Sequence, residues 1–240
     1  MAWTATATVS LCCRLVRLPV VPYARRPPPL STRCSAAQSP DAVDREYADL
    51  NLRPLYPNRG HHLRIRQHVN PLSSSFSEPT EPPEWKEVFD DPLLPLMVDI
   101  GCGSGRFLIW LAKNSGERRN YLGLEIRQKC PDPHFKKRHH KRRVLQPQLV
   151  DSITKNLCLS GRVLLQSDVL EVAADMRERF DGCSDVFEHV DCIDKDLRCN
   201  NEGWLLDNPM GIRTEREIHA ELEGATIYRR MYQKTRNFHH

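Results

Sequence analysis

The 240-residue sequence predicts an α/β fold in which helices cover both faces of a mostly parallel, doubly wound sheet. Three observations predict it. The apolar run 96–100 has the length of a buried strand and leads directly into a glycine-rich turn. Residues 107–112 follow with helical spacing, and residues 121–125 form a second apolar strand. Strand, turn, helix and strand in this order make a βαβ unit.

The remaining elements are predicted in chain order. Residues 51–83 carry six prolines and a serine run, which predicts an irregular lead-in, with a short helix starting near residues 84–86. Residues 149–157 suit a helix, 162–166 a strand that ends near Asp168, 169–180 a helix, and 226–232 a terminal strand. We therefore divide the chain into a tail without regular structure (1–45), a proline-rich lead-in (46–95) and one folded domain that is truncated internally (96–236). The stretch 188–202 carries no motif that indicates a function.

The first forty residues contain no acidic side chain but several arginines with scattered Ser, Thr and Ala. This composition is typical of an organelle transit peptide, and a disordered basic tail is the alternative. The Ser and Thr content favours a chloroplast over a mitochondrion. We expect no membrane span, because the sequence has no long apolar run.

The nine cysteines show no paired C-x-x-C arrangement with the spacing of a metal site, and their number is odd. We expect reduced thiols and no metal. A zinc site built from Cys183, Cys192, Cys199 and His189 is the alternative.

The glycine-rich turn runs from Asp99 through Gly101, Gly103 and Gly105. Glycines let the backbone turn tightly and let a ligand approach the start of the following helix. Glu125 ends the next strand, where an acid can bind both hydroxyls of a ribose, so the pair implies a nucleoside-containing cofactor. A dinucleotide fingerprint needs G-x-G-x-x-G, and here position 106 is arginine. The arrangement resembles motif I of class I S-adenosylmethionine-dependent methyltransferases, which have a Rossmann-like sheet; NAD and a turn without a ligand are the alternatives.

The segment 130–143 places a carboxylate directly before a dense block of cations. Asp132 lies between two prolines, which hold its backbone extended, and it can accept hydrogen bonds from a guanine base edge. The basic side chains suit the phosphates of a nucleic acid, which contribute affinity rather than base choice. These side chains are Lys136, Lys137, Arg138, Lys141, Arg142 and Arg143. A basic run alone is more often a solvated face or a nuclear signal.

Together, the turn, Glu125 and the block 131–143 resemble the tRNA (guanine-N7)-methyltransferases of the single-subunit bacterial type. The segment 208–217 also resembles the closing T-x-x-E element of that family, with Thr214 and Glu217 at its ends. The resemblance covers about residues 96–234 and implies S-adenosylmethionine as cofactor and tRNA as partner, with no obligate partner subunit.

The resemblance also implies roles for single residues. Asp99, Glu125 and Asp132 would contact the cofactor, in a pocket shaped by the three glycines. Asp132 would act where cofactor and target guanine meet, as an orienting and electrostatic group rather than a base. The substrate would be bound by Lys136, Asp168, Thr214, Glu215, Arg216 and Glu217, and the other cations of the block would hold tRNA phosphates.

The sequence departs from the family between Lys129 and Cys130. Glu125 and Asp132 are seven positions apart, whereas the family has about forty to fifty residues there and a parallel crossover needs about a dozen or more. We therefore expect an internal deletion that removes about two central strands with their helices, leaves flanking strands without partners, and weakens cofactor binding. A non-catalytic RNA-binding remnant and a different S-adenosylmethionine-dependent methyltransferase are the alternative functions.

Overall fold

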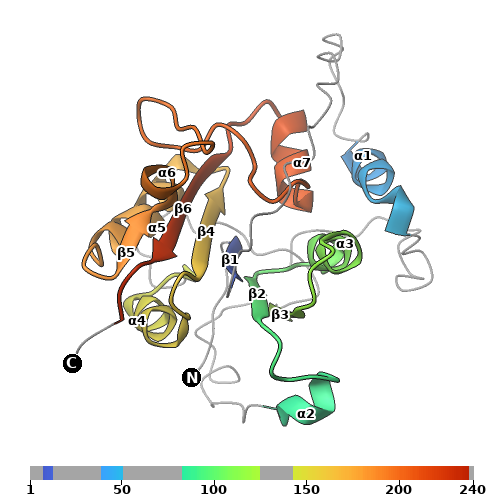
Figure 1. Cartoon of the computed structure of the whole chain (residues 1–240). Coiled ribbons are helices and arrows are strands. Elements are labelled where there is room, and N and C mark those ends of the chain that lie inside the picture. Colours follow the sequence, from blue (N-terminus) through green and yellow to red (C-terminus); the bar gives the residue numbers. More distant parts are fainter. Residues whose placement is uncertain (1–7, 13–38, 51–82, 125–142, 238–240) are drawn as a thin grey trace, which may run out of the picture.

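The computed structural model describes residues 8–12, 39–50, 83–124 and 143–237 of the chain. Its strands form one six-stranded sheet with the order β3-β2-β1-β4-β6-β5 (Figure 1). The strands are β1 (Thr8–Cys12), β2 (Leu96–Ile100), β3 (Asn120–Leu124), β4 (Arg162–Ser167), β5 (Phe187–His189) and β6 (Tyr228–Lys234).

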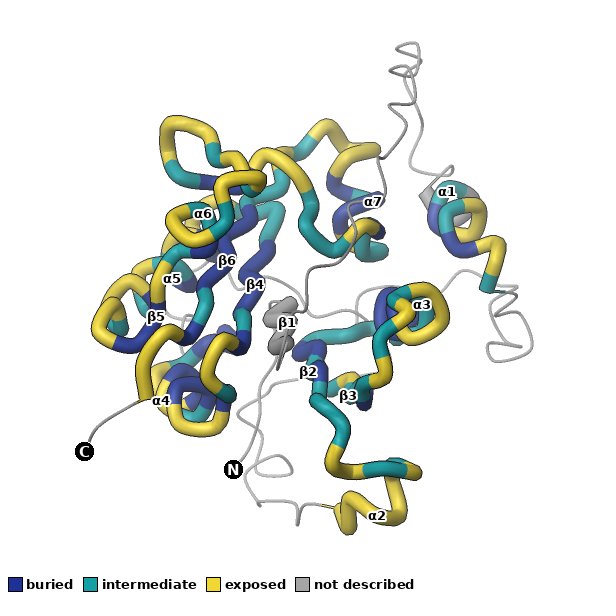
Figure 2. The backbone as a smooth tube through the Cα atoms, viewed as in Figure 1, coloured by how far each residue is buried: buried dark blue, intermediate teal, exposed yellow. Residues whose placement is uncertain are grey.

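The helices lie on both faces of this sheet. They are α1 (Ser39–Glu46), the 3₁₀ turn η2 (Ala48–Leu50), α2 (Trp85–Val88), α3 (Arg106–Asn114), α4 (Pro147–Asn156), α5 (Leu170–Asp181), α6 (Val190–Ile193) and α7 (Glu215–Leu222). Helices α4 and α5 bury their apolar side chains against one face, with Val163, Leu165 and Tyr232 of the strands. Helices α1, α3 and α7 share a second core around Met97 on the other face, and the buried inner sides of both layers are visible in Figure 2. The α/β class with helices on both faces is confirmed, but the described sheet is mixed rather than mostly parallel, because only the pairing of β2 with β3 is parallel.

The order and direction of the strands determine which strand ends lie next to each other. β2 and β3 are parallel and in direct register, from the pair Leu96–Asn120 to the pair Ile100–Leu124. β1 is antiparallel to both β2 and β4, so β2 and β4 run in the same direction. β6 returns antiparallel to β4. The carboxyl ends of β2, β3 and β4 therefore lie along one edge of the sheet.

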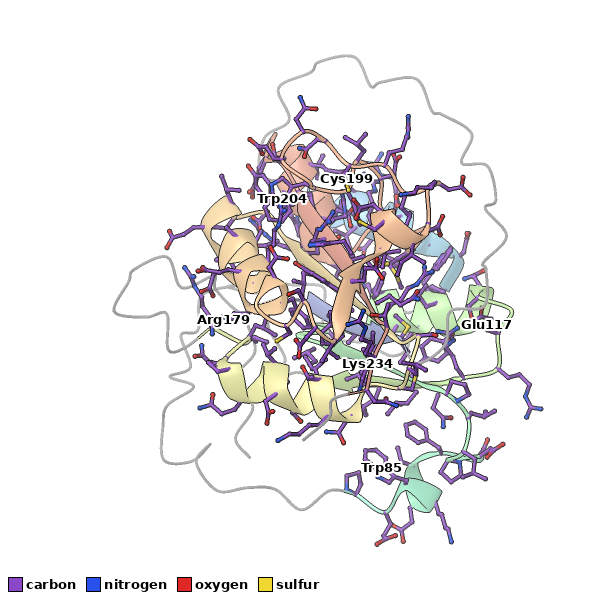
Figure 3. All side chains as sticks on the ribbon, turned by 60° about the vertical axis from the view of Figure 1, so that its left-hand side comes forward. Trp85, Glu117, Arg179, Cys199, Trp204 and Lys234 are labelled. Atoms are coloured by element: carbon purple, nitrogen blue, oxygen red, sulfur yellow. The ribbon has the colours of Figure 1, made fainter. Side chains whose placement is uncertain are left out.

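Most predicted elements are present within about two residues of their expected bounds, including the βαβ unit and the terminal strand. The stretch 188–202, for which we had no interpretation, holds part of β5, the short helix α6 and an isolated bridge between Cys199 and Leu205. Cys199 and Trp204 lie near one another in Figure 3, whereas Trp85 on α2 lies apart from the body of the domain.

Two expectations need correction. The tail 1–45 was expected to lack structure, yet it contains β1 and most of α1. The strands before and after the expected deletion, β3 and β4, were predicted to lack partners. β4 instead pairs with β1, which also pairs with β2, whereas β3 lies at the edge of the described sheet beside β2. The physical reason is that β2 and β4 offer backbone N–H and C=O groups that must be paired, and a short segment that alternates Thr, Val, Ser, Leu and Cys can supply such a ladder.

Within the described residues, none of the helices is long and apolar enough to cross a membrane.

Candidate active site

The candidate site lies along the edge where β2, β3 and β4 end. The glycine turn follows β2, Asp168 directly follows β4, and α7 precedes the start of β6 at the same edge. Three segments that are far apart in the sequence therefore meet there. The sequence motifs predicted each segment separately, and the sheet topology brings them together.

The turn owes its shape to its glycines. Gly101, Gly103 and Gly105 have φ values of 88°, 56° and 74°, in the left-handed region that favours glycine. The Gly101 amide donates to the carbonyl oxygen of Leu124 at 2.7 Å, which fixes the turn to the end of β3. Gly105 is the N-cap of α3, so backbone amides at the start of this helix face the site.

Asp99 and Gly123 pack beneath this turn. The Asp99 side chain, in the strand that enters the turn, is only 2% exposed. Gly123, its partner in β3, leaves room for the turn, because a Cβ there would lie 2.7 Å from Sγ of Cys102. A buried carboxylate beneath an open backbone turn is suited to a cationic or hydroxyl-bearing group of a ligand.

Asp168 is held by an arginine of α7. Nε of Arg216 donates to Oδ2 of Asp168 at 3.0 Å, and the second guanidinium nitrogen contacts the same oxygen. The structure thus joins two residues that were predicted to bind substrate. Arg216 remains about half exposed, so its guanidinium faces solvent at the edge of the site.

Thr214 and Glu217 form a capping box at the start of α7. The Thr214 hydroxyl accepts from the Glu217 amide, while the Glu217 carboxylate accepts from the Thr214 amide. The same carboxylate also receives Asn208 Nδ2 at 3.0 Å, Gln166 Nε2 at 3.3 Å and the guanidinium of Arg229. The Glu217 carboxylate therefore holds the T-x-x-E element in place through hydrogen bonds and an ion pair.

Glu215 lies between α7 and the glycine turn. Its Oε1 accepts a hydrogen bond from the Ser104 hydroxyl and forms an ion pair with Nε of Arg106 at 3.1 Å. Sequence reasoning missed Ser104 and Arg106 as site residues. The signal that could have found Arg106 is its place at the first position of a helix, where a cation needs a nearby carboxylate.

His219 lies one turn further along α7. Burial lowers the pKa of this imidazole, although the neighbouring Glu215 carboxylate acts in the opposite direction. His219 is therefore neutral at neutral pH.

Arg143 is buried and pairs with two carboxylates of α5, Glu171 at 3.1 Å and Asp175 at 3.3 Å. Its predicted role in phosphate binding stays a prediction. The other predicted residues of this region lie outside the described residues: Glu125, Asp132, Lys136, Lys137, Arg138, Lys141 and Arg142. Among the side chains that the structure describes, no group of three or more His, Cys, Asp or Glu could hold a metal ion.

The parallel βαβ unit, the glycine turn and the buried acid that enters it are features that class I methyltransferases have. A methyltransferase family model, Methyltransf_4, matches residues 94–130 and 129–230. Two curated relatives are tRNA (guanine-N(7)-)-methyltransferases of Synechocystis sp., 37% identical over 72% of this chain and 98% of that protein, and of Synechococcus elongatus, 37% identical over 71% and 96%. A third, from Trichormus variabilis, is 34% identical over 72% of this chain and 96% of that protein. The chain belongs to the family of tRNA (guanine-N(7)-)-methyltransferases.

The same alignments contain a discontinuity. The family model matches in two pieces that meet at residues 129–130. The alignment with the Synechocystis protein spans 219 positions but takes in 72% of the 240 residues, about 173, so about 46 positions have no counterpart here.

Proposed function

We propose that this chain transfers a methyl group from S-adenosylmethionine to N7 of a guanine in tRNA. The observation that carries the proposal is the convergence at one sheet edge of the glycine turn, Asp168 and the Thr214–Glu217 element, in a chain of this family. Each of these parts is weak evidence alone, because glycine turns and helix caps are common.

The described residues of the turn fit S-adenosylmethionine. The buried Asp99 carboxylate suits the amine of the methionine end, and the left-handed glycines let the cofactor approach the backbone at the start of α3. By the family resemblance, Glu125 would bind the ribose and Asp132 would lie beside the methyl group. When bound, the cofactor supplies an electrophilic methyl group.

The protein residues have mainly an orienting task in this reaction. Guanine N7 carries a free lone pair and no proton, so a general base is not required. Positive charge develops on the base as the bond forms, and the Asp132 carboxylate would offset it. The remaining contribution is to align the two reactants, which the T-x-x-E element and Asp168 would do on the tRNA side.

The direct test is transfer of a tritiated methyl group to unmodified tRNA, followed by chemical cleavage of the RNA at N7-methylguanine. We expect label at one guanine position for the wild-type chain, and loss of at least about tenfold in kcat/KM for Asp132→Asn with nearly unchanged tRNA affinity. Lys155→Gln, a change on the exposed side of α4, is the matched control and should keep activity. Label at another atom, or equal activity of the two variants, would contradict the proposal.

A second candidate is an RNA-binding form that does not transfer methyl groups. The observation that favours it is the discontinuity at residues 129–130, together with the unmatched positions in the alignment. Such a form would bind tRNA with a steep salt dependence and give no label in the transfer assay. Sequencing the transcript across the Lys129–Cys130 junction would show whether a longer form exists.

We further propose delivery to the chloroplast, with the mitochondrion as the alternative. The support is the acid-free, arginine-containing start of the chain and the cyanobacterial source of its relatives. Import of the full chain fused to a fluorescent protein tests it; fluorescence confined to the cytosol would contradict both destinations.

A further inference from the structure

Glu215 is a residue through which α7 contacts the glycine turn. A single oxygen of this carboxylate contacts both Ser104, within the turn, and Arg106, the first residue of α3. The turn is the predicted cofactor site, and α7 carries the predicted tRNA element. One side chain therefore links the two halves of the site.

The contact has a strong electrostatic reason. Arg106 is 5% exposed and lies at the positive end of the α3 dipole, where a cation is unfavourable. A buried cation must be paired. Its described carboxylate partners are Glu215 and, at 3.0 Å, Asp44 of α1. The Asp44 side chain is 66% exposed and Glu215 only 20%, so solvent weakens the pairing with Asp44 more than the pairing with Glu215.

The start of α7 is also held to the sheet, by the two residues that follow Glu215. Arg216 ties the helix to Asp168 at the end of β4, and the Glu217 carboxylate ties it to β6 through Arg229. On its other side, the turn is held to β3 by the Gly101 amide. A displacement of the turn away from α7 would therefore break the contacts of Glu215 before those that hold α7 to the sheet.

We propose that Glu215 is a positioning residue that couples cofactor binding at the turn to tRNA binding at α7. This rests on the proposed function and assigns Glu215 a role through Ser104 and Arg106 rather than on the tRNA itself. The ligand that binds first fixes the turn and α7 relative to one another. The second ligand then binds to a site that is already ordered. Such coupling is reciprocal: each ligand increases the affinity of the other by the same factor.

Calorimetric titrations of the full-length chain test the coupling. The affinity for S-adenosylhomocysteine, the cofactor product that has no methyl group to transfer, is measured without and with saturating tRNA, and the affinity for tRNA is measured without and with S-adenosylhomocysteine. For the wild type we expect each ligand to tighten the other by about fivefold or more. Glu215→Gln keeps the shape and a hydrogen-bond acceptor for Ser104 but loses the charge opposite Arg106. We expect it to bind each ligand alone within about threefold of the wild type and to show a coupling factor near one.

Glu223→Gln is the matched control, because Glu223 lies at the other end of the same helix, where its carboxylate is 3.7 Å from Arg216 and does not contact the turn. It should keep the wild-type coupling. Amide hydrogen exchange without any ligand gives a second readout. Glu215→Gln should exchange the amides of residues 102–107 about tenfold faster, with unchanged rates in α5.

Unchanged coupling or unchanged exchange in Glu215→Gln would overturn the proposal, as would a wild type that binds both ligands independently. A wild type that binds neither ligand would overturn it together with the proposed function. Failure of the proposed function alone has a different signature: the wild type shows coupling that depends on Glu215, yet it transfers no methyl group.

Discussion

Arg229 of β6 and Glu217 of α7 form an ion pair whose side chains are 8% and 1% exposed. Nε of Arg229 also donates to Gln166 of β4 at 2.9 Å, so the guanidinium joins two strands and a helix. Because Glu217 caps α7, this pair fixes the position of the whole T-x-x-E element relative to the sheet.

Removing the cation should therefore destabilise the protein strongly. In Arg229→Met, the Glu217 carboxylate stays buried without its counter-charge, and we expect a loss of about 3–5 kcal/mol in the free energy of unfolding, measured by urea titration. The double change Arg229→Met with Glu217→Gln should cost less than the sum of the two single changes, because the pair is coupled. A loss below about 1 kcal/mol for Arg229→Met would show that the pair is not the anchor described here.

The elements of the fold could be predicted because each one is a local pattern. Apolar runs of strand length, a glycine turn and helical spacing are visible within about a dozen neighbouring residues. The pairing of β1 could not be predicted, because its five residues lie within an arginine-containing tail and their partners in β2 and β4 are remote in the sequence. Strand neighbours are decided by the unpaired backbone groups of the whole sheet rather than by a local signal.

Protonation of His189 should make the stability of the protein depend on pH. Nε of Arg230 donates to Nδ1 of His189 at 2.6 Å, which requires a neutral imidazole with a lone pair at Nδ1. Burial lowers the pKa of His189 from its usual 6.5, and the charge of Arg230 lowers it further, although Asp181 acts in the opposite direction. The unfolded chain thus takes up this proton more readily than the folded chain. Stability from His189 is complete above pH 6.5 and falls as the pH decreases from 6.5 towards the lower pKa of the folded state.

The measurement is urea unfolding across this range of pH for the wild type and His189→Gln. We expect a smaller decline towards low pH in the variant. Burial also lowers the pKa of His219, so His219→Gln is the necessary comparison and should remove a separate part of the decline. An identical decline in the wild type and both variants would mean that other groups determine the acid sensitivity.

The candidate site was predictable only as separate pieces. The family resemblance assigned roles to Asp99, Asp168 and the Thr214–Glu217 element, because each belongs to a short motif that is visible in the sequence. The contact between Ser104 and Glu215 spans 111 positions and has no local signature. A buried cation at the start of a helix needs a carboxylate nearby, which explains why such a contact forms. This requirement does not predict which carboxylate of the chain will make the contact.

Arg143 tests whether the phosphate-binding part of the segment 130–143 extends to its last residue. Because its guanidinium is buried between Glu171 and Asp175, we expect Arg143→Met to lower the free energy of unfolding by about 1–3 kcal/mol. The salt dependence of tRNA binding should stay unchanged, whereas Arg138→Met should reduce its slope by about one. Fluorescence titrations of labelled tRNA at several salt concentrations measure both. A reduced slope for Arg143→Met would instead place this residue among the phosphate contacts.

The strand β1 makes the start of the chain part of the folded domain. Ser10 is paired with Asp99 of β2 and Leu164 of β4, and proline at this central position removes an N–H group from the ladder. We expect Ser10→Pro to destabilise the protein by about 3 kcal/mol or more and to promote aggregation through the newly unpaired edges, as measured by thermal unfolding and light scattering. Ser10→Thr, which keeps the N–H group, is the matched control and should behave like the wild type. If Ser10→Pro unfolds at the wild-type temperature, the sheet does not depend on β1. If it unfolds early, β1 is a structural strand of the domain, and removal of residues 8–12 would destabilise this chain.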